Sequence, residues 1–545
     1  MVTRKPLHLP YLALVLSGFL IARCSVVQPA PTDALQPPPK AVTPTPTVFL
    51  PPTEISGGDI WLSPSLPAAF AETWQDPDLQ ERGFYLIDER EAADIEVIPA
   101  GEAQLTTWIY ALVAPFPTTI DGITWETLQS LWSGPEGLEP ILVSSDTLVM
   151  LEPLLGPAGE NVLIAPAEKL SELTWQLRPA FAIIPFEALE PRWKVLAIEG
   201  QSPIQREFEI SAYPLRVMIG IEGPPDAPEI LTQLLDIPIS NRDADQMTIL
   251  VMTGVTALTR ATAWQMDRRG INFPALKIGY WLQEADLTHI SHEVAFTPDC
   301  PPPDPAQVGL RFCADPDHIE LLELVGTDII ELTGNHVRDY GSDALDYTLG
   351  EYRKRGWGTF GGGVDLEAAF EPLLIEHNGN QFAFLGCNQA GPKYAWATED
   401  SPGSTPCETD LLFAQVQQLA ASGYQVIFSY QWGEGSVVLE PQRKAFEAAV
   451  NAGALIVNGS QAHQPLGMAF HQDGFLHFGL GNLFFDQMQT IALRSEVIDR
   501  HIFYEGRYIS TELLTAMLES YAQPRPMTLE ERSAFLGELF DDSGW

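Results

Sequence analysis

An asparagine and a histidine stand side by side at the end of an apolar run. Residues 328–332 have the composition of a buried strand, and Thr333-Gly334-Asn335-His336 follows directly. An amide oxygen and an imidazole nitrogen are both ligands that proteins offer to divalent metals. Presented together at the carboxyl end of a strand, they indicate one part of a metal site.

Four further segments carry side chains that suit the same site, and a fifth element follows them. The four segments are Gly254-Val255, Ser291-His292-Glu293, Gln431-Trp432-Gly433 and Gly459-Ser460-Gln461-Ala462-His463. The later element runs from Gly479 to Asp486 and contains Asn482.

In this order the segments resemble the CapA family, which is linked to capsule and poly-γ-glutamate synthesis. The fold of that family is similar to the metallophosphoesterases that hold two metals. The resemblance covers residues 247–490 and implies that residues 247–545 form a four-layer α/β/β/α sandwich. Strand candidates that alternate with helical segments over this region agree with an α/β class.

Three positions depart from the ligands that the resemblance implies. Val255 stands where the family has an aspartate, and Gln431 and Gln461 stand where it has histidines. A two-metal phosphoesterase needs a bridging carboxylate to hold its cations ~4 Å apart. We therefore do not expect a two-metal centre.

Four candidate ligands remain, carried over from the family: Glu293, Asn335, His336 and His463. Mixed nitrogen and oxygen ligation suits a single Zn²⁺ or Mn²⁺, and the alternative is that no metal binds. His336 and His463 are also the catalytic candidates, and whether the protein is an enzyme stays open. His292 would point away from Glu293 on a strand, so a surface or core histidine is expected there.

The retained residues also suit roles without a metal. His336 would hydrogen-bond Asp339 and cap the following helix, and Asn335 tolerates a left-handed backbone. Amides at positions 431 and 461 keep a pocket polar without metal chemistry, which favours a site converted to ligand binding. The expected pocket residues are Gln431, Trp432, Gln461, Asp339 and Asn482.

The composition limits the partners. The 545 residues predict two or three domains, and 30 basic against 72 acidic residues give a net charge of −42. Such a surface repels nucleic acids and anionic lipid headgroups. It also counts against direct binding of a polyanion, so the expected partner is a cell-envelope polymer or a small ligand.

The first 24 residues have the pattern of an export signal of lipoprotein type. Arg4 and Lys5 precede an apolar stretch at 11–22, and Cys24 follows, although Arg23 stands where a small residue is usual. Residues 25–55 are a proline-rich linker that suits a tether. We expect an exported protein on the extracellular face, with Cys24 lipidated; the alternatives are an uncleaved anchor or an incidental apolar start.

Residues 56–222 read as a smaller α/β domain. A buried strand is predicted at 108–113, a helix at 124–132 with Thr124 as its N-cap, and strands at 180–186 and 194–198. The region resembles periplasmic substrate-binding proteins but is short for their two lobes. Residues 223–246, rich in proline and aspartate, are expected to link it to the domain at 247–545.

Four cysteines beyond Cys24 allow two disulfides in an oxidising compartment. Local pairing joins Cys300 to Cys313 and Cys387 to Cys407, and the spacing fits no zinc motif.

Three functions compete. The first is a non-catalytic envelope protein that binds a polymer or a small ligand through a degenerate CapA-like site. The second is a metal-dependent hydrolase or transferase that acts on a cell-surface polymer. The third is a sensor that binds its ligand through the N-terminal domain.

Overall fold

The computed structural model describes residues 57–545. The expected signal, Cys24 and the predicted linker before residue 56 lie outside this part of the chain. Within residues 57–545, no helix combines the length and apolar character needed to cross a bilayer.

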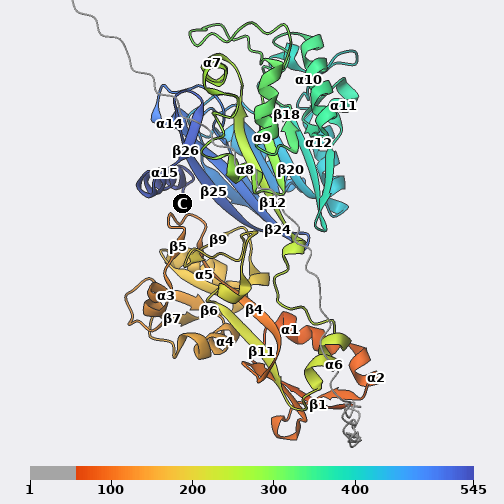
Figure 1. Ribbon diagram of the computed structural model, residues 1–545, viewed down its shortest axis with the longest axis vertical. Coiled ribbons are helices and arrows are strands. Elements are labelled where there is room, and N and C mark those ends of the chain that lie inside the picture. The colour runs from red at the N-terminus through yellow and green to blue at the C-terminus, as the bar shows by residue number, and fades with distance from the viewer. Residues whose placement is uncertain (1–56) are drawn as a thin grey trace, which may run out of the picture. The chain divides into compact units, whose positions relative to one another are not determined.

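The first part of the described chain folds around a nine-stranded mixed sheet (Figure 1). The strand order is β2-β1-β3-β11-β4-β8-β6-β7, and β9 also pairs with β4. These strands are β1 Gly58–Leu62, β2 Phe84–Leu86, β3 Ile95–Pro99, β4 Ala103–Pro115, β6 Ile141–Val143, β7 Val162–Ile164, β8 Phe181–Pro185, β9 Trp193–Val195 and β11 Arg216–Glu222. The helices are α1 Ala68–Glu72, α2 Pro77–Glu81, α3 Trp125–Trp132, α4 Ser145–Leu155, α5 Leu170–Leu177 and α6 Ala227–Leu234.

Several predicted elements of this part are confirmed. The strand expected at 108–113 lies inside β4, which is buried along nearly its whole length. Helix α3 begins after Thr124, whose side chain accepts a hydrogen bond from the backbone N–H of Thr127 as an N-cap does.

One strand prediction for this part is wrong, and the region expected to link the two domains contains a helix. The strand expected at 194–198 is divided into β9 and β10 (Ala197–Ile198), because β9 pairs with β4 whereas β10 pairs with β5 (Gly122–Ile123). The expected linker at 223–246 contains α6, which buries Ala227 and Leu231. Its proline lies in the first helical turn, where a missing backbone N–H costs no hydrogen bond.

The later part of the described chain contains two large sheets. The seven-stranded sheet has the order β15-β14-β13-β12-β24-β25-β26, and the six-stranded sheet has the order β17-β18-β20-β21-β23-β22. The first comprises β12 Met247–Thr256, β13 Leu287–His292, β14 Ile329–Glu331, β15 Gly358–Phe360, β24 Ser495–Tyr504, β25 Arg507–Glu519 and β26 Gln523–Pro526. The second comprises β17 Leu373–His377, β18 Asn380–Asn388, β20 Gln425–Gln431, β21 Ile456–Ser460, β22 Met468–His471 and β23 Gly474–His477. A small pair, β16 Gly362–Gly363 and β19 Gly403–Ser404, lies apart from both.

One buried cluster draws on both of these sheets. Leu250 and Met252 of β12 contribute to it together with Phe384 of β18, Ile427 of β20 and Phe475 of β23. Because side chains alternate along a strand, the neighbouring residues Val251 and Val255 belong to a different cluster.

Helices supply the other apolar clusters. One joins β12 to helices α7 Arg260–Arg269, α8 Gly279–Gln283, α9 Glu320–Leu324 and α10 Ser342–Arg355. Another joins β20 and β21 to helices α12 Thr409–Ala421 and α13 Glu440–Asn451. The remaining helices are α11 Leu366–Phe370, α14 Ile491–Arg494 and α15 Leu529–Asp542. The architecture is therefore mixed α/β with several sheets, as the sequence predicts.

The N-terminal and later parts meet within one compact unit. Ile249, Ile502 and Tyr504 belong to the same buried cluster as the core of the nine-stranded sheet. The domain boundaries at 222 and 247 stay a prediction.

Both expected disulfides are present. Cys300 pairs with Cys313 across 13 residues, and Cys387 with Cys407 across 20 residues. The second one ties the end of β18 to the segment before α12.

We predict that replacing Cys387 and Cys407 together by serine lowers the free energy of unfolding by ~3 kcal/mol, since the bridge restricts the unfolded chain over a 20-residue loop. Urea unfolding of the parent and the variant measures the difference. Thiol titration of the denatured parent under non-reducing conditions is expected to find none of the four paired cysteines free, and labelling of any of them contradicts the pairing.

Candidate functional site

The predicted site residues come from the carboxyl ends of two sets of parallel strands. In one sheet β12, β13 and β14 run parallel, and in the other β18, β20 and β21 do. Glu293 follows β13, Asn335 follows β14, and Gln431 ends β20. The hydroxyls of Ser291 and Ser460 lie 3.0 Å apart and join the two sheets at this edge.

Gln431 is the centre of the site. Its amide nitrogen donates hydrogen bonds to Oε1 of Glu293 at 2.7 Å and to Oδ1 of Asn335 at 3.1 Å. A carboxylate only accepts, which fixes the nitrogen of the amide toward Glu293. The amide oxygen is buried and has no hydrogen-bond partner within residues 57–545. A neutral donor thus contacts two of the four candidate metal ligands.

Close backbone packing brings Glu293 into this position. A Cβ at Gly334 would lie 2.9 Å from Cγ and 3.0 Å from Cα of Glu293. Any larger residue would push the loop after β14 away from the loop after β13. Glycine is therefore required between Thr333 and Asn335.

His336 makes the hydrogen bond expected from the sequence. Its Nδ1 lies 2.7 Å from Oδ2 of Asp339, which also accepts from the backbone N–H of Phe312 at 2.9 Å. The hydroxyl of Tyr394 donates to the other oxygen of Asp339 at 3.0 Å. The carboxylate therefore holds the imidazole in one orientation.

The pKa of His336 is raised above its ordinary value. Burial is the largest single influence and lowers it, but the hydrogen bond to Asp339 and the nearby negative charges together outweigh burial. The negative charges of Glu293 and Glu434 act in the same direction. The carboxylates of Asp339, Glu293 and Glu434 thus all favour the charged form of the imidazole.

His463 is held in a similar way by an amide. Its Nδ1 donates to Oδ1 of Asn482 at 2.9 Å, and the amide nitrogen of Asn482 donates to the carbonyl oxygen of His463 at 2.9 Å. The Nε2 atom lies 4.0 Å from Oε1 of the exposed Glu434.

The other two predicted pocket residues are placed differently. Gln461 has a left-handed backbone with φ of 73°, and its buried amide oxygen has no partner in the described chain. Trp432 packs edge-on against Tyr430 at 5.7 Å and against Phe446 at 6.3 Å. Trp432 thus contributes an aromatic wall beside Gln431.

His292 is a core histidine, as expected. It is fully buried, stacks on Phe296 at 4.7 Å, and its Nδ1 accepts from the hydroxyl of Tyr352 at 2.7 Å. Burial lowers its pKa to about 3, so the ring is neutral.

Val255 lies inside an apolar cluster. Its backbone N–H donates to the carbonyl oxygen of Gly481, and its own carbonyl accepts from Leu483, both at 2.9 Å. The side chain is buried among hydrophobic neighbours. The side chain at position 255 is therefore part of the core.

The sequence did not single out Arg260 or Glu434. Arg260 pairs with Asp486 and lies over the rings of Phe312 at 5.1 Å and Phe485 at 4.8 Å. Those two rings contact His336 and His463 respectively. Glu434 directly follows the Gln431-Trp432-Gly433 segment, so its position was a usable signal, whereas nothing in the spacing marks Arg260.

The donor set does not fit a metal centre. Among residues 57–545, no three histidine, cysteine, aspartate or glutamate side chains come together in a way that could hold an ion. The Gln431 amide engages Glu293 and Asn335, while His336 and His463 are held by separate partners. The assignment of these four residues as ligands stays a prediction.

Comparisons with known proteins agree with this placement of the motifs. Residues 249–487 match the sequence model described as bacterial capsule synthesis protein PGA_cap. Capsule biosynthesis protein CapA of Bacillus anthracis is 23% identical over 299 residues, which are 53% of this chain and 72% of that protein. PGA biosynthesis protein CapA of Bacillus subtilis (strain 168) is 24% identical over 193 residues, 35% of this chain and 51% of that protein. Residues 249–487 therefore carry the sequence of the CapA family of capsule synthesis proteins.

One further relative and two solved structures are also similar to parts of the chain. A probable polyglutamine synthesis accessory protein of Mycobacterium tuberculosis is 26% identical over 211 residues, 36% of this chain and 55% of that protein. An ABC-type phosphate transport receptor from Vibrio cholerae is similar over 33% of this chain and 93% of its own, with 14% identity and a TM-score of 0.28. The NAD nucleotidase of Haemophilus influenzae is similar over 54% of this chain and 56% of its own, with 10% identity and a TM-score of 0.31. Structural scores this low carry no conclusion.

We predict that Gln431→Leu lowers the free energy of unfolding by ~1.5–3 kcal/mol, because it leaves a buried carboxylate without its donor. In a Glu293→Leu background the same change is expected to cost less, with a coupling energy of ~1–2 kcal/mol. Urea unfolding of the four proteins gives the cycle.

The matched control is Gln417→Leu, the same chemical change at an exposed position of α12. It should alter the free energy of unfolding by less than ~0.5 kcal/mol. A coupling energy near zero would show that Gln431 does not stabilise Glu293.

Proposed function

We propose that the protein is a non-catalytic binding protein of capsule or poly-γ-glutamate synthesis, in which a degenerate CapA-family site holds a cell-envelope polymer or a small ligand. The amide nitrogen of Gln431 between Glu293 and Asn335 carries this proposal. This nitrogen donates to Oε1 of Glu293 and Oδ1 of Asn335, the two oxygens that would otherwise be available to a cation. Val255, at the position of the lost bridging carboxylate, is buried in the core.

The relatives support a role in capsule or poly-γ-glutamate synthesis. Their names assign them to capsule biosynthesis and to PGA biosynthesis, and the matched domain is the one that contains the site. We interpret the two facing sheets and their outer helices as the four-layer α/β/β/α sandwich of that family. The N-terminal α/β part is interpreted as a reduced domain of the substrate-binding-protein type.

The rim of the site suits an anionic or polar ligand despite the acidic composition. Arg260, which pairs with Asp486, lies over two rings that contact His336 and His463, and the pKa of His336 is raised. This local balance differs from the net charge of −42 of the whole chain. A polymer segment with carboxylate or hydroxyl groups is the class of ligand that these donors fit.

A metal-dependent hydrolase or transferase is the second candidate, and one observation favours it. His336 and His463 are each fixed through Nδ1, by a carboxylate and an amide, so that Nε2 makes no hydrogen bond within the described residues. Histidines that ligate metals are commonly oriented in this way. The missing carboxylate and imidazoles weigh against it.

We predict that the purified protein holds at most one divalent metal and hydrolyses phosphodiesters little or not at all. The triple variant Val255→Asp, Gln431→His and Gln461→His should bind more Zn²⁺ or Mn²⁺ if the strand ends keep the family's geometry, because it restores a carboxylate and two imidazoles. Elemental analysis after dialysis against each metal measures the content, and a chromogenic phosphodiester measures turnover.

The control for the triple variant makes the same replacements at exposed positions: Val308→Asp, Gln417→His and Gln418→His. It should leave the metal content unchanged. Two tightly bound metals in the parent would overturn the proposal of a degenerate site. No gain in the triple variant would mean that the site no longer has the family's geometry.

Export and tethering are part of the proposal and rest on the first 55 residues of the sequence. We predict that radioactive palmitate labels the parent when it is produced in a bacterial host, since Cys24 follows a basic and apolar start. Cys24→Ser should abolish the label, and Cys300→Ser should keep it. A parent that remains unlabelled would refute lipidation at Cys24.

A further inference from the structure

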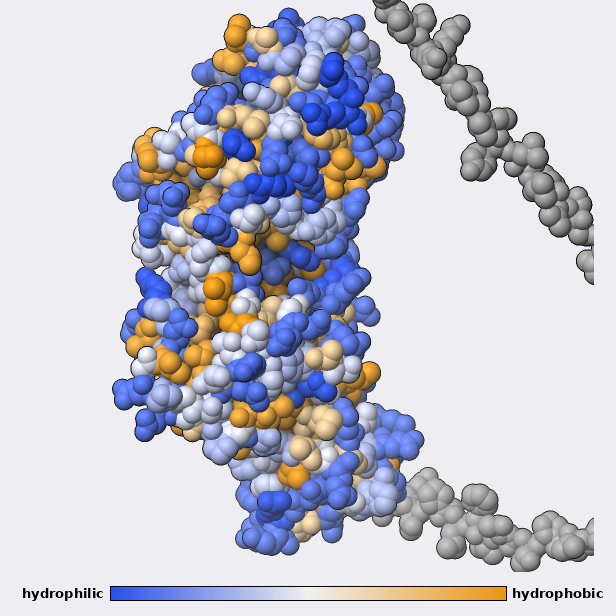
Figure 2. Space-filling model, turned by 60° about the vertical axis from the view of Figure 1, so that its left-hand side comes forward, coloured by the Kyte–Doolittle hydropathy of each residue, from blue (hydrophilic) through white to orange (hydrophobic). Residues whose placement is uncertain are grey.

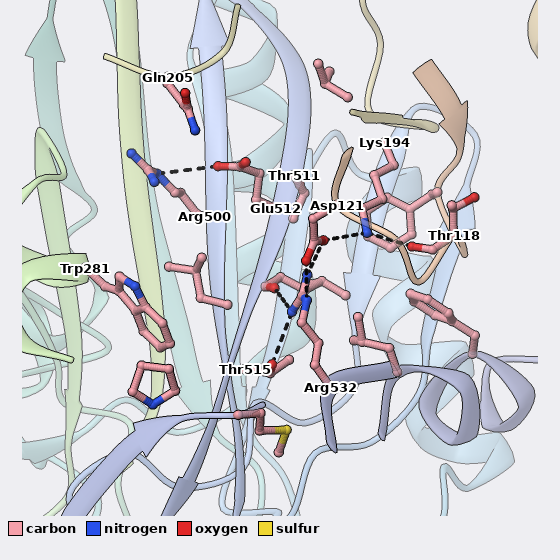
Figure 3. A pocket seen from close by; sticks show the side chains of 18 residues that line it. Thr118, Asp121, Lys194, Gln205, Trp281, Arg500, Thr511, Glu512, Thr515 and Arg532 are labelled. Atoms are coloured by element: carbon pink, nitrogen blue, oxygen red, sulfur yellow. Dashed lines mark hydrogen bonds and ion pairs between the residues drawn. The ribbon is translucent and has the colours of Figure 1, made fainter. Parts of the chain in front are cut away.

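A second cavity lies away from the CapA-type site. Its volume is about 300 Å³, and strands β24, β25 and β26, helix α15 and the segment around β9 line it. Figure 3 shows charged side chains at two of its ends, and the side of the molecule turned forward in Figure 2 is hollowed, with hydrophobic residues at the margin. This volume lies at the lower end of the range for small-molecule sites.

One end of the cavity is a closed hydrogen-bond network. Arg532 donates to both oxygens of Asp121 at 2.7 Å, and to the carbonyl oxygen of Leu513. The amine of Lys194 lies 2.8 Å from the same carboxylate and donates to the carbonyl oxygen of Thr118 at 2.7 Å. These charges compensate one another, so this end supplies a rigid wall.

The other end carries two charges that are not well compensated. Arg500 of β24 and Glu512 of β25 stand opposite each other in the strand register, and their closest atoms, Nε and Oε2, are 3.7 Å apart. This distance is too long for a hydrogen bond. Only 11% of the Arg500 side chain and 28% of the Glu512 side chain are exposed, and burial raises the pKa of Glu512 above its ordinary value.

The atoms of this pair that face the cavity are free to bind. Within the described residues, the terminal nitrogens of Arg500 and Oε1 of Glu512 make no hydrogen bond. These three atoms are not fully buried. The amide of Gln205 points its nitrogen toward the Arg500–Glu512 pair (Figure 3), while its oxygen accepts from the backbone N–H of Ser202. Donors thus gather beside Arg500, and a single acceptor lies opposite.

The walls between the two ends are apolar. Trp281, Leu514, Pro526 and Met527 line the cavity as well. A bound molecule therefore has to combine a compact pair of opposite charges with a hydrophobic group.

We propose that this cavity binds a free α-amino acid with an apolar side chain. The carboxylate of the ligand accepts hydrogen bonds from Arg500 and Gln205, and its ammonium group donates to Glu512. The two charges of such a zwitterion are separated by a single carbon, which suits a cationic and an anionic side chain placed on adjacent strands. Its side chain packs against Trp281 and Met527. This site is independent of the proposed function of the CapA-type site.

Calorimetric titration of the full chain with L-leucine, L-methionine and L-phenylalanine tests the proposal. Isovalerate, which lacks the ammonium group, isoamylamine, which lacks the carboxylate, and inorganic phosphate are the comparison ligands. We expect at least one of the amino acids to bind about tenfold or more tightly than all three. Equal binding of isovalerate or phosphate would overturn the proposal in favour of a simple anion site, and no binding by any amino acid at about 10 mM would overturn it as well.

Substitutions in the cavity test whether the amino acid binds there. Arg500→Gln and Glu512→Gln are each expected to weaken amino-acid binding by about tenfold or more, whereas Arg268→Gln, an exposed arginine on α7, should leave it unchanged. Thermal unfolding shows whether each variant is folded. Unchanged affinity in a folded Arg500→Gln or Glu512→Gln would refute the assigned site, and the ligand comparison on the unmodified protein decides the matter if neither variant folds.

Discussion

Packing between two sheets determines where the functional side chains lie. Leu250 and Met252 of one sheet share a buried cluster with Phe384 and Ile427 of the other, so the two sets of parallel strands end at one edge. Side chains that lie 96 and 138 residues apart in the chain meet there because of this apolar contact. The hydrogen bonds of Gln431 to Glu293 and Asn335 form across the same edge.

A neutral amide at the centre of the site changes its electrostatics. A divalent cation would compensate the charge of Glu293 and repel a charged imidazole, whereas the amide of Gln431 gives hydrogen bonds but no net charge. The negative charge of Glu293 then acts on His336, whose pKa is raised. In the proposed binding site, His336 beside Asp339 and Arg260 beside Asp486 are the groups that would contact an anionic or polar ligand.

Much of this arrangement was predictable from the sequence, for reasons that differ between elements. Long apolar runs such as those in β4 and β12 identify buried strands, and Thr124 marks the start of α3. The hydrogen bond between His336 and Asp339 also followed from their spacing. Helix α6 was missed because a proline in a first helical turn looks the same in a sequence as a proline in a linker.

Other features depend on contacts that no local pattern reveals. The position of Arg260 is set by Phe312 and Phe485, which lie about fifty and more than two hundred residues away in the chain. The bonds of the Gln431 amide depend on the register between two sheets. Opposite positions in the β24–β25 hairpin place Arg500 beside Glu512, but their missing hydrogen bond is visible only in three dimensions.

Strand β24 has a consequence for how the protein reaches its native state. It pairs antiparallel with β12, from Met247 opposite Tyr504 to Met252 opposite Asp499. The central strand of the seven-stranded sheet therefore has one neighbour that lies some 250 residues later in the chain. During synthesis, one edge of β12 has unpaired backbone hydrogen-bonding groups until β24 has been made, and an unpaired strand edge is prone to wrong pairing. The family match ends at residue 487, before β24 begins. A fragment cut at that boundary would keep the whole CapA-type site and yet lack the strand that closes the edge of β12, so aggregation of such a fragment would reflect its boundary and say nothing about the site.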